Sequence, residues 1–299
     1  ANTDNSRFQR AADNQVLGGQ LEIVLGNNNA AQNVIISGSR QQQAINESQI
    51  LDFLNSSETA PDFELIVADD QLNDGLSVFS LTTTGDVHIA NNANINMSSK
   101  TVVQDGAVKR SAFAIDARSI NVDGQIYMAS GEVKLQTHQL LNQGGELNVN
   151  NIIDVSGNWV NDTLRNSDHS SQLNLHGGSI SLIADGDLSL TENSILKANS
   201  GTWLQADGNL VKGNGGKIKL VTVEQLSASE FSDFLMNGSI EAYAAGTGGQ
   251  LELVANTINI ANQFDSPAAT GELQLTSDFF TLNGFSSYSL TSNTSHLTV

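Results

Sequence analysis

The chain has 299 residues, and its 32 acidic against 13 basic side chains give a formal net charge of -19 at neutral pH. This charge repels phosphate backbones and anionic lipid surfaces, so a nucleic acid partner is not expected. Cysteine is absent, which excludes disulfides and thiolate metal sites, and no run approaches the roughly 18 apolar residues of a membrane span.

Hydrophobic residues make up 39% of the chain but aromatic residues only 5%, so a core must consist of thin layers of small aliphatic side chains. The 26 glycines and 2 prolines favour short strands joined by tight turns. We therefore expect one continuous β body over residues 1–299. Ala1 does not start a charged and apolar signal segment, so the signal of an exported chain would lie upstream or have been removed.

Two insertions interrupt the strand pattern, at residues 40–64 and 223–238. In the second, Ser227 is a possible N-cap followed by Glu230 three residues later, and Gly238 is a possible stop, which predicts a short helix. The first contains a similar SQILDFLN segment. We expect both to cover corners of the fold; the alternative is that they bind a partner.

The stretch at residues 69–75 carries enough side-chain oxygens to bind calcium, in Asp69, Asp70, Asn73 and Asp74. Its spacing matches neither an EF-hand loop nor the glycine-rich nonapeptide repeat. No metal and no other cofactor is therefore expected.

Five Gly-Gly pairs recur along the chain, and most are followed at once by alternating apolar and polar residues, as in GSISLI at 178–183 and GQLELV at 249–254. GELNV at 145–149 follows the same rule. The pairs are Gly18-Gly19, Gly144-Gly145, Gly177-Gly178, Gly215-Gly216 and Gly248-Gly249. Copies of one strand-and-turn unit at regular spacing indicate a repeat architecture.

Three strands are predicted within residues 177–200, with corners at Asp185-Gly186 and Glu192-Asn193. Strands this short gain stability when they stack in parallel on their copies. The sequence predicts an all-β fold, a right-handed parallel β-helix (solenoid) with short helical or loop insertions. About a dozen coils ~4.8 Å apart would make a rod roughly 55 Å long. An antiparallel barrel remains the alternative, because Asp-Gly turns also join hairpins.

The segment IIDVSGNWVNDT at 152–163, a following loop and Gly-Gly strand, and SIEAYAAG at 239–246 resemble the repeats of filamentous haemagglutinin family exoproteins. The resemblance covers roughly residues 110–285. It implies a section of a very large secreted β-helical protein that an outer-membrane transporter exports by two-partner secretion. It also implies an extracellular place on the bacterial cell surface and a role in adhesion, biofilm formation or contact-dependent competition.

The secretion domain of that family carries Asn-Pro-Asn motifs, and none occurs here, where Pro61 and Pro267 are the only prolines. The resemblance is therefore to the shaft and not to the secretion domain.

Carboxylates are the first candidates for chemistry, because a polysaccharide lyase or hydrolase needs them beside a groove. Asp185 and Asp187 flank a corner glycine, where a turn-forming role is the simpler interpretation. The other acidic candidates are Asp69, Asp70, Asp74 and Asp116. The basic candidates, which form no cluster in the sequence, are Arg110, Arg118 and Arg165.

The histidines are spread singly, without the spacing of zinc ligands, so surface or corner positions are expected. They are His88, His138, His169, His176 and His296. Trp159 and Trp203 are possible platforms for sugar stacking, but packing over a corner is favoured. Asparagines at polar strand positions should form stacked amide ladders. These are Asn148, Asn150, Asn174 and Asn259.

We therefore expect a structural or adhesive section of a surface filament, without catalysis of its own, whose partners are the outer-membrane transporter and a host or bacterial receptor or glycan. Two alternatives stay open. One is a carbohydrate-active β-helix enzyme, which would need several carboxylates and a basic residue in one groove. The other is a self-assembling extracellular fibre subunit with unpaired strand edges at its ends.

Overall fold

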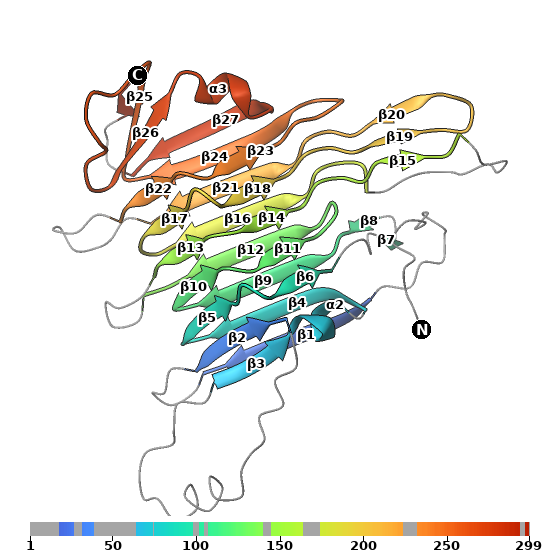
Figure 1. The fold of residues 1–299 in the computed structure, drawn as a ribbon, viewed down its shortest axis with the longest axis horizontal. Helices are drawn as coiled ribbons and strands as arrows, with labels where there is room; N and C mark the ends of the chain where they lie inside the picture. Colours follow the sequence, from blue (N-terminus) through green and yellow to red (C-terminus); the bar gives the residue numbers. More distant parts are fainter. Residues whose placement is uncertain are drawn as a thin grey trace, which may run out of the picture.

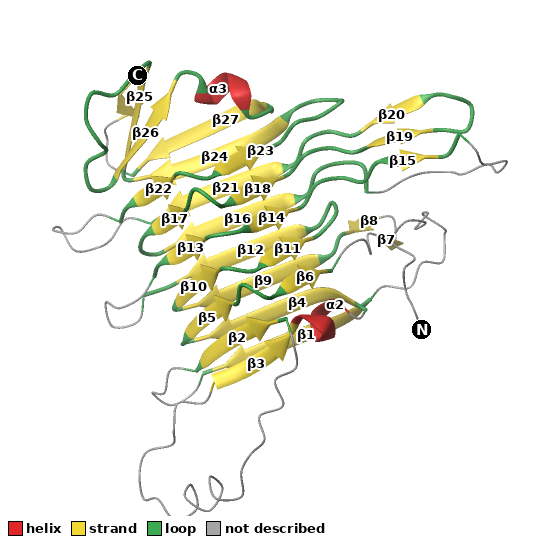
Figure 2. Ribbon diagram, in the orientation of Figure 1, coloured by secondary structure: helices red, strands yellow, loops and turns green. Residues whose placement is uncertain are grey.

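The computed structural model of the chain describes residues 18–26, 32–38, 64–73, 75–97, 102–104, 107–139, 145–163, 174–223, 232–293 and 297–298. The fold is all-β, and its three largest sheets pair their strands in parallel. Figure 2 shows the strands stacked on one another and joined by loops and turns. Parallel pairing excludes the antiparallel barrel.

The first sheet has eight strands, in the order β1-β4-β9-β12-β16-β21-β24-β27. Their spans are β1 (Gly19–Leu25), β4 (Leu76–Thr83), β9 (Ala112–Ala117), β12 (Glu132–Thr137), β16 (Ser179–Ala184), β21 (Lys217–Thr222), β24 (Gly249–Ala255) and β27 (Phe285–Ser292). The sheet therefore stacks eight strands where the sequence led us to expect about a dozen coils, and that expected length was too great.

The second sheet has seven strands, in the order β22-β17-β13-β10-β5-β2-β3, and the third has five, in the order β23-β18-β14-β11-β6. The seven are β22 (Phe234–Met236), β17 (Leu188–Leu190), β13 (Leu147–Val149), β10 (Ser119–Val122), β5 (Asp86–Ile89), β2 (Asn33–Ser37) and β3 (Glu64–Ala68). The five are β23 (Ser239–Glu241), β18 (Ile195–Lys197), β14 (Ile152–Asp154), β11 (Gln125–Tyr127) and β6 (Asn94–Asn96).

From β4 to β23, the strands of the three large sheets follow one another in a constant order, interrupted only by strands of smaller sheets; before them, β2 and β3 both belong to the seven-stranded sheet. The three strands expected within residues 177–200 are β16, β17 and β18, one in each sheet. The next three, β21, β22 and β23, follow in the same order of sheets, and each pairs with the corresponding strand of the first set. Figure 1 shows the resulting stack, in which colour runs from blue to red along the strand order except at the blue end, where β3 lies outside the earlier strand β2. Equivalent strands of successive visits therefore become hydrogen-bonded neighbours.

Alternation within each strand places every second side chain inside the stack. In β16 the inward residues are Ile180 and Leu182, which pair in register with Ile218 and Leu220 of β21. All four are completely buried. One hydrophobic cluster of such rows runs from Val34 to Phe285, so thin aliphatic layers do form the core.

The glycine pairs mark two different corners, and the single rule inferred from sequence was wrong for one of them. The pairs ending at Gly178, Gly216 and Gly249 begin strands of the eight-stranded sheet, but Gly145 precedes β13 of the seven-stranded sheet. The corner before β12 is Ser130-Gly131 instead, with Ser130 at a φ of 57°. A serine in this left-handed conformation hides the repeat from a search for Gly-Gly.

A lateral arm leaves the stack on one side (Figure 1). It consists of β15 (Val160–Asn161), β19 (Thr202–Leu204) and β20 (Leu210–Lys212). β15 pairs with β19 in parallel, and β19 pairs with β20 antiparallel. The remaining strands are β25 (Thr257–Ala261), β26 (Glu272–Thr276) and β28 (Leu297–Thr298) in one parallel sheet, and β7 (Val102–Gln104) with β8 (Ala107–Lys109) in an antiparallel pair.

The insertion at 40–64 lies outside the described residues except for Glu64, which begins β3. The helix start expected at Ser227 also lies outside them. Phe234–Met236 form β22, however, and Leu188 of β17 pairs with Phe234. The prediction that a helix continues to Gly238 was therefore wrong for residues 234–236. Pairing of these residues with β17 outweighs their local helical preference.

Two short helices lie where the five-stranded sheet ends. α2 (Asp69–Asn73) lies beside the terminal strand β6, and its side chains replace a pairing strand. Oδ2 of Asp69 accepts from the backbone N of Asn94 at 2.7 Å, and Oδ1 of Asn73 accepts from the backbone N of Asn96 at 2.6 Å. At the other end, α3 (Phe279–Leu282) precedes Asn283, whose carbonyl accepts from the backbone N of Ala242.

Because Asp69 is 8% exposed and satisfies a strand amide, Asp69→Ala should lower the free energy of unfolding by about 1–2 kcal/mol. The amide hydrogen of Asn94 should also exchange faster with solvent. Denaturant titration and hydrogen exchange measure the two effects. Glu192→Ala, at an exposed turn, is the control, and equal stability of the two variants would contradict the edge-covering role of Asp69.

Candidate functional site

A polar row runs along the start of the strands in the seven-stranded sheet. We define the polar row as the residue that precedes the first inward side chain of each strand from β2 to β22. Its members are Asn33, Asp86, Ser119, Glu146, Asp187 and Asp233. Strand register places Asp86 opposite Ser119. The row is half-buried to exposed and acidic, so it is the first place to look for binding or catalysis.

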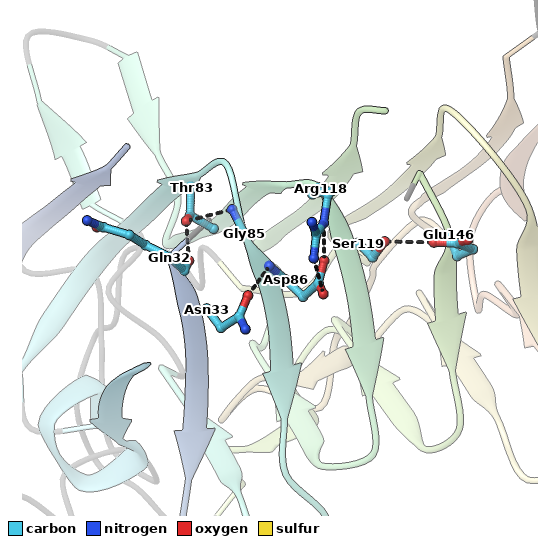
Figure 3. Close-up of polar contacts among 8 residues, drawn as sticks. All are labelled: Gln32, Asn33, Thr83, Gly85, Asp86, Arg118, Ser119 and Glu146. Atoms are coloured by element: carbon cyan, nitrogen blue, oxygen red, sulfur yellow. Dashed lines mark hydrogen bonds and ion pairs between the residues drawn. The ribbon is translucent and has the colours of Figure 1, made fainter. Parts of the chain in front are cut away.

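Figure 3 shows how the first part of the polar row is connected. Oδ1 of Asn33 accepts from the backbone N of Asp86 at 3.0 Å. Arg118, one residue before the row, donates from Nε and Nη2 to the two carboxylate oxygens of Asp86 at 2.8 and 2.6 Å. Ser119 donates to Glu146 at 2.7 Å. The hydrogen bonds that Arg118 donates to Asp86 raise the pKa of Arg118 above its ordinary value.

The later part of the polar row continues the same pattern through backbone donors. Oδ1 of Asp187 accepts from the backbone N of Asp233 at 2.8 Å, and Oδ1 of Asp233 accepts from the backbone N of Gly271 at the same distance. Each contact joins one strand position to the next. The row therefore links neighbouring strands along much of the stack.

The Asp123 cluster lies on the outer face of the same sheet. One carboxylate oxygen of Asp123 lies 2.8 Å from Nε2 of His88 and accepts from Asn121 at 2.8 Å; the other accepts from Asn150 at 2.7 Å. Asn150 also donates to the amide oxygen of Asn121 at 3.0 Å, as expected of an amide ladder. Burial raises the pKa of Asp123, but the hydrogen bonds from Asn150, His88 and Asn121 outweigh it and hold that pKa below its ordinary value.

This depressed pKa gives the stability of the chain a pH dependence with a definite sign. In the folded chain the pKa of Asp123 lies below its ordinary value of 3.8. The stability that its ionised carboxylate contributes is therefore present above pH 3.8 and is lost as the pH falls through the folded pKa. We expect Asp123→Asn to be less stable than the parent at pH 7, with a difference that shrinks below about pH 4. Urea titrations from pH 7 to 3 measure it.

Asp265→Asn, which removes an exposed carboxylate outside the Asp123 cluster, is the matched control for the substitution itself. A constant difference between Asp123→Asn and the parent across the same pH range would contradict the role of the cluster.

The structure separates the carboxylates that the sequence nominated. Asp185 follows β16 and accepts from the backbone N of Gln139, which follows β12. Asp187 instead contacts Asp233, which precedes β22. The two side chains that flank Gly186 thus bind neighbours on opposite sides of their own layer. They brace the stack between strands, where the sequence had suggested hydrogen bonds within their own turn.

The remaining acidic candidates lie elsewhere. Asp69 belongs to α2 and contacts β6. Asp116 lies in β9 and pairs with Nδ1 of His138 at 2.9 Å. Strand β12 lies between β9 and β16, the strand that Asp185 follows. Asp74 and Arg165 lie outside the described residues, as do His169 and His296. His176 accepts from the backbone N of Asn214 at 2.9 Å. Among the described residues, no group of three or more His, Asp or Glu side chains could hold a metal ion.

The eight-stranded sheet carries one further ionic cluster on its outer face. Glu252 of β24 contacts Lys217 at 2.7 Å and Lys219 at 2.8 Å, both in the neighbouring strand β21. The hydrogen bonds from the two ammonium groups lower the pKa of Glu252. This cluster also joins adjacent strands.

The two tryptophans of the lateral arm have opposite environments. Trp203 is 5% exposed and donates from Nε1 to Oδ2 of Asp162 at 2.9 Å, which agrees with a structural role. Trp159 is 77% exposed, so the expectation that it packs over a corner was wrong. The WVND segment gives no signal of this exposure, because two apolar residues are followed by two polar ones and the polarity does not alternate.

Comparison with family models, with curated proteins and with solved structures gives no match. In the part of the chain that the structure describes, no helix is both long and apolar enough to cross a membrane.

Proposed function

We propose that this chain is a right-handed parallel β-helix and serves as a structural or adhesive section of a secreted bacterial surface filament. The observation that carries the proposal is the constant order in which the strands from β4 to β23 visit three parallel sheets. In a solenoid each turn resembles its neighbour, so that like residues stack and bury a continuous core. The aliphatic rows supply such a core.

The polar contacts support a scaffold in preference to an enzyme. The polar row, the Asp123 cluster and the Glu252 pairs all connect one strand to the next. A glycosidase would instead present a carboxylate pair about 5–10 Å apart toward a bound sugar. Carboxylates already held by backbone donors from other strands are suited to stabilising the stack.

The resemblance of residues 152–163 and 239–246 to filamentous haemagglutinin repeats adds the biological setting. In this proposal the chain is exported by an outer-membrane transporter and displayed outside the cell, where exposed segments contact a host or bacterial receptor or glycan. The scaffold has no catalytic task of its own. In this proposal the scaffold holds binding surfaces away from the cell envelope.

Immunogold labelling of intact producing cells tests this proposal, with antibodies raised against the purified chain. Labelling outside the cell that disappears when the outer-membrane transporter is deleted is the expected result. Retention in the cytoplasm, or release of reducing sugars when the purified chain is mixed with bacterial or plant polysaccharides, would contradict it. Beads coated with the chain should also adhere to cells more than beads coated with heat-unfolded chain.

A fibre subunit is the second candidate, and the sheet edges favour it. Within the described residues, β1 pairs only with β4 and β27 only with β24. Such edges can add to those of another copy. Sedimentation over a range of concentrations should then show growing oligomers, whereas a constant monomer would leave the filament section as the function.

A further inference from the structure

The lateral arm presents a pentapeptide with strict alternation, Trp159 to Thr163. Trp159, Asn161 and Thr163 are exposed, whereas Asp162 between them is 4% exposed. Asp162 is fixed by Trp203, and its backbone N donates to the carbonyl oxygen of Leu204 at 2.8 Å. The arm therefore holds Asp162 inward and presents Trp159, Asn161 and Thr163 to solvent.

Asn161, Asp162 and Thr163 form an Asn-X-Thr tripeptide, the acceptor sequence for N-linked sugars. The conformation also fits an acceptor. Oδ1 of Asn161 accepts from Oγ1 of Thr163 at 2.8 Å and from its backbone N at 3.1 Å. Both bonds engage the amide oxygen, so Nδ2, the atom that would carry a sugar, takes no part in the turn.

Trp159 immediately precedes β15 and lies two residues before Asn161, and exposure alternates from Trp159 to Thr163 as it does along an extended segment, in which residues two apart share a face. Trp159 as a whole residue is 77% exposed, an unusual position for so large an apolar residue unless something covers it. The C–H face of a sugar attached to Asn161 would reach the indole ring of Trp159. A sugar in that position would shield the indole and be held by it.

We propose that Asn161 is an N-glycosylation site and that its first sugar packs against Trp159. The donor is a sugar activated by a phosphate leaving group, either a nucleotide sugar or a lipid-linked oligosaccharide. The Nδ2–C1 bond forms as the bond from C1 to the phosphate oxygen breaks. The leaving phosphate keeps that oxygen, and the proton lost from Nδ2 passes to a base of the transferase, so no oxidant or reductant is needed.

Of the other Asn-X-Ser/Thr tripeptides, only the one at Asn237 lies wholly within the described residues; the asparagines of two more, Asn96 and Asn293, are described without their Ser or Thr. Nδ2 of Asn293 donates to the carbonyl oxygen of Thr222 at 3.0 Å and is therefore engaged. Asn237 is exposed, but Oγ of Ser239 points to Glu241 at 3.5 Å, and the residue two before it is Leu235. Asn237 is thus a matched control, an exposed acceptor sequence without the Thr hydroxyl contact or the aromatic ring.

Peptide mass spectrometry of the chain purified from its producing cells tests the modification. The peptide with Asn161 should carry a sugar, at least fivefold more often than the peptide with Asn237. Asn161→Gln should lose that mass and Asn237→Gln should keep it. A single hexose would identify a nucleotide sugar as the donor, and an oligosaccharide would identify a lipid carrier. An unmodified Asn161 in the native protein would overturn the proposal.

The contact with Trp159 has its own readout. The purified chain, glycosylated in vitro with UDP-glucose and a soluble asparagine N-glucosyltransferase, should show sugar-ring protons shifted upfield in NMR spectra by the indole ring current. Trp159→Ala should abolish the shift, and Trp159→Phe should restore part of it. Since Trp159 is exposed, both variants should fold. The same chemical shifts in all three proteins would overturn the stacking contact, whatever the occupancy of Asn161.

Discussion

Phe113→Ala is expected to lower the free energy of unfolding by about 3–5 kcal/mol, the range for removing a large buried aromatic side chain. Phe113 lies in β9, is fully buried and stacks on Phe79 of β4 with ring centroids 5.2 Å apart. Only 5% of the chain is aromatic, so few other bulky side chains can close the cavity. Urea titration followed by circular dichroism measures the loss.

Two controls separate the cavity from other effects of the change. Phe113→Leu keeps most of the buried volume and should cost about 1–2 kcal/mol. Leu235→Ala removes a side chain that is 52% exposed and should change stability by less than about 0.5 kcal/mol. If Phe113→Ala and Leu235→Ala were equally stable, the rings of Phe113 and Phe79 could not form part of a packed core.

Gly216→Ala is expected to destabilise the chain by about 2–4 kcal/mol, as overpacking against rigid backbone does. A Cβ at Gly216 would lie well inside 3.0 Å of the carbonyl oxygen of Gly178, the equivalent glycine of the neighbouring layer. A Cβ at Gly178 would meet the carbonyl oxygen of Gly131 in the same way. The stacked backbones must therefore separate to admit a single methyl group.

Gly19→Ala is the matched control for Gly216→Ala, because it makes the same change at the start of β1 in the same sheet. Its Cβ would lie 3.2 Å from the flexible tip of Leu76 and at an ordinary contact distance of 3.8 Å from the carbonyl oxygen of Gly75, so the loss should stay below about 1 kcal/mol. Denaturation midpoints of the two variants decide the matter. Equal losses would show that the glycines act through chain flexibility and not through close approach of the backbones.

The strands were predictable because each carries its own signal. Alternation in GSISLI and GKIKLV indicates which side chains are buried, and β16 and β21 bury those residues. The parallel arrangement followed from the repetition of such units. Local alternation and a repeated spacing are properties of short segments, and a single sequence displays them directly.

The contacts between strands were not predictable, because they depend on register. Nothing near Asp187 in sequence indicates that it meets Asp233, 46 residues later. The turn at Ser130 was missed for a different reason, since a serine there adopts the conformation that glycine usually supplies. The exposure of Trp159 was missed because an aromatic residue in a β segment is more often buried, and the lateral arm could not be inferred from β15 alone.

The direction of the hydrogen bonds determines how the stack would respond to a pulling force. Strands of each large sheet are bonded to the strands before and after them in the stacking order, so tension between the two ends acts along these bonds. Bonds loaded in this direction open one strand at a time from an end. α2 and α3, which lie at the two ends of the five-stranded sheet, would be among the first elements to detach. A tether built this way lengthens stepwise under load and leaves its middle layers folded.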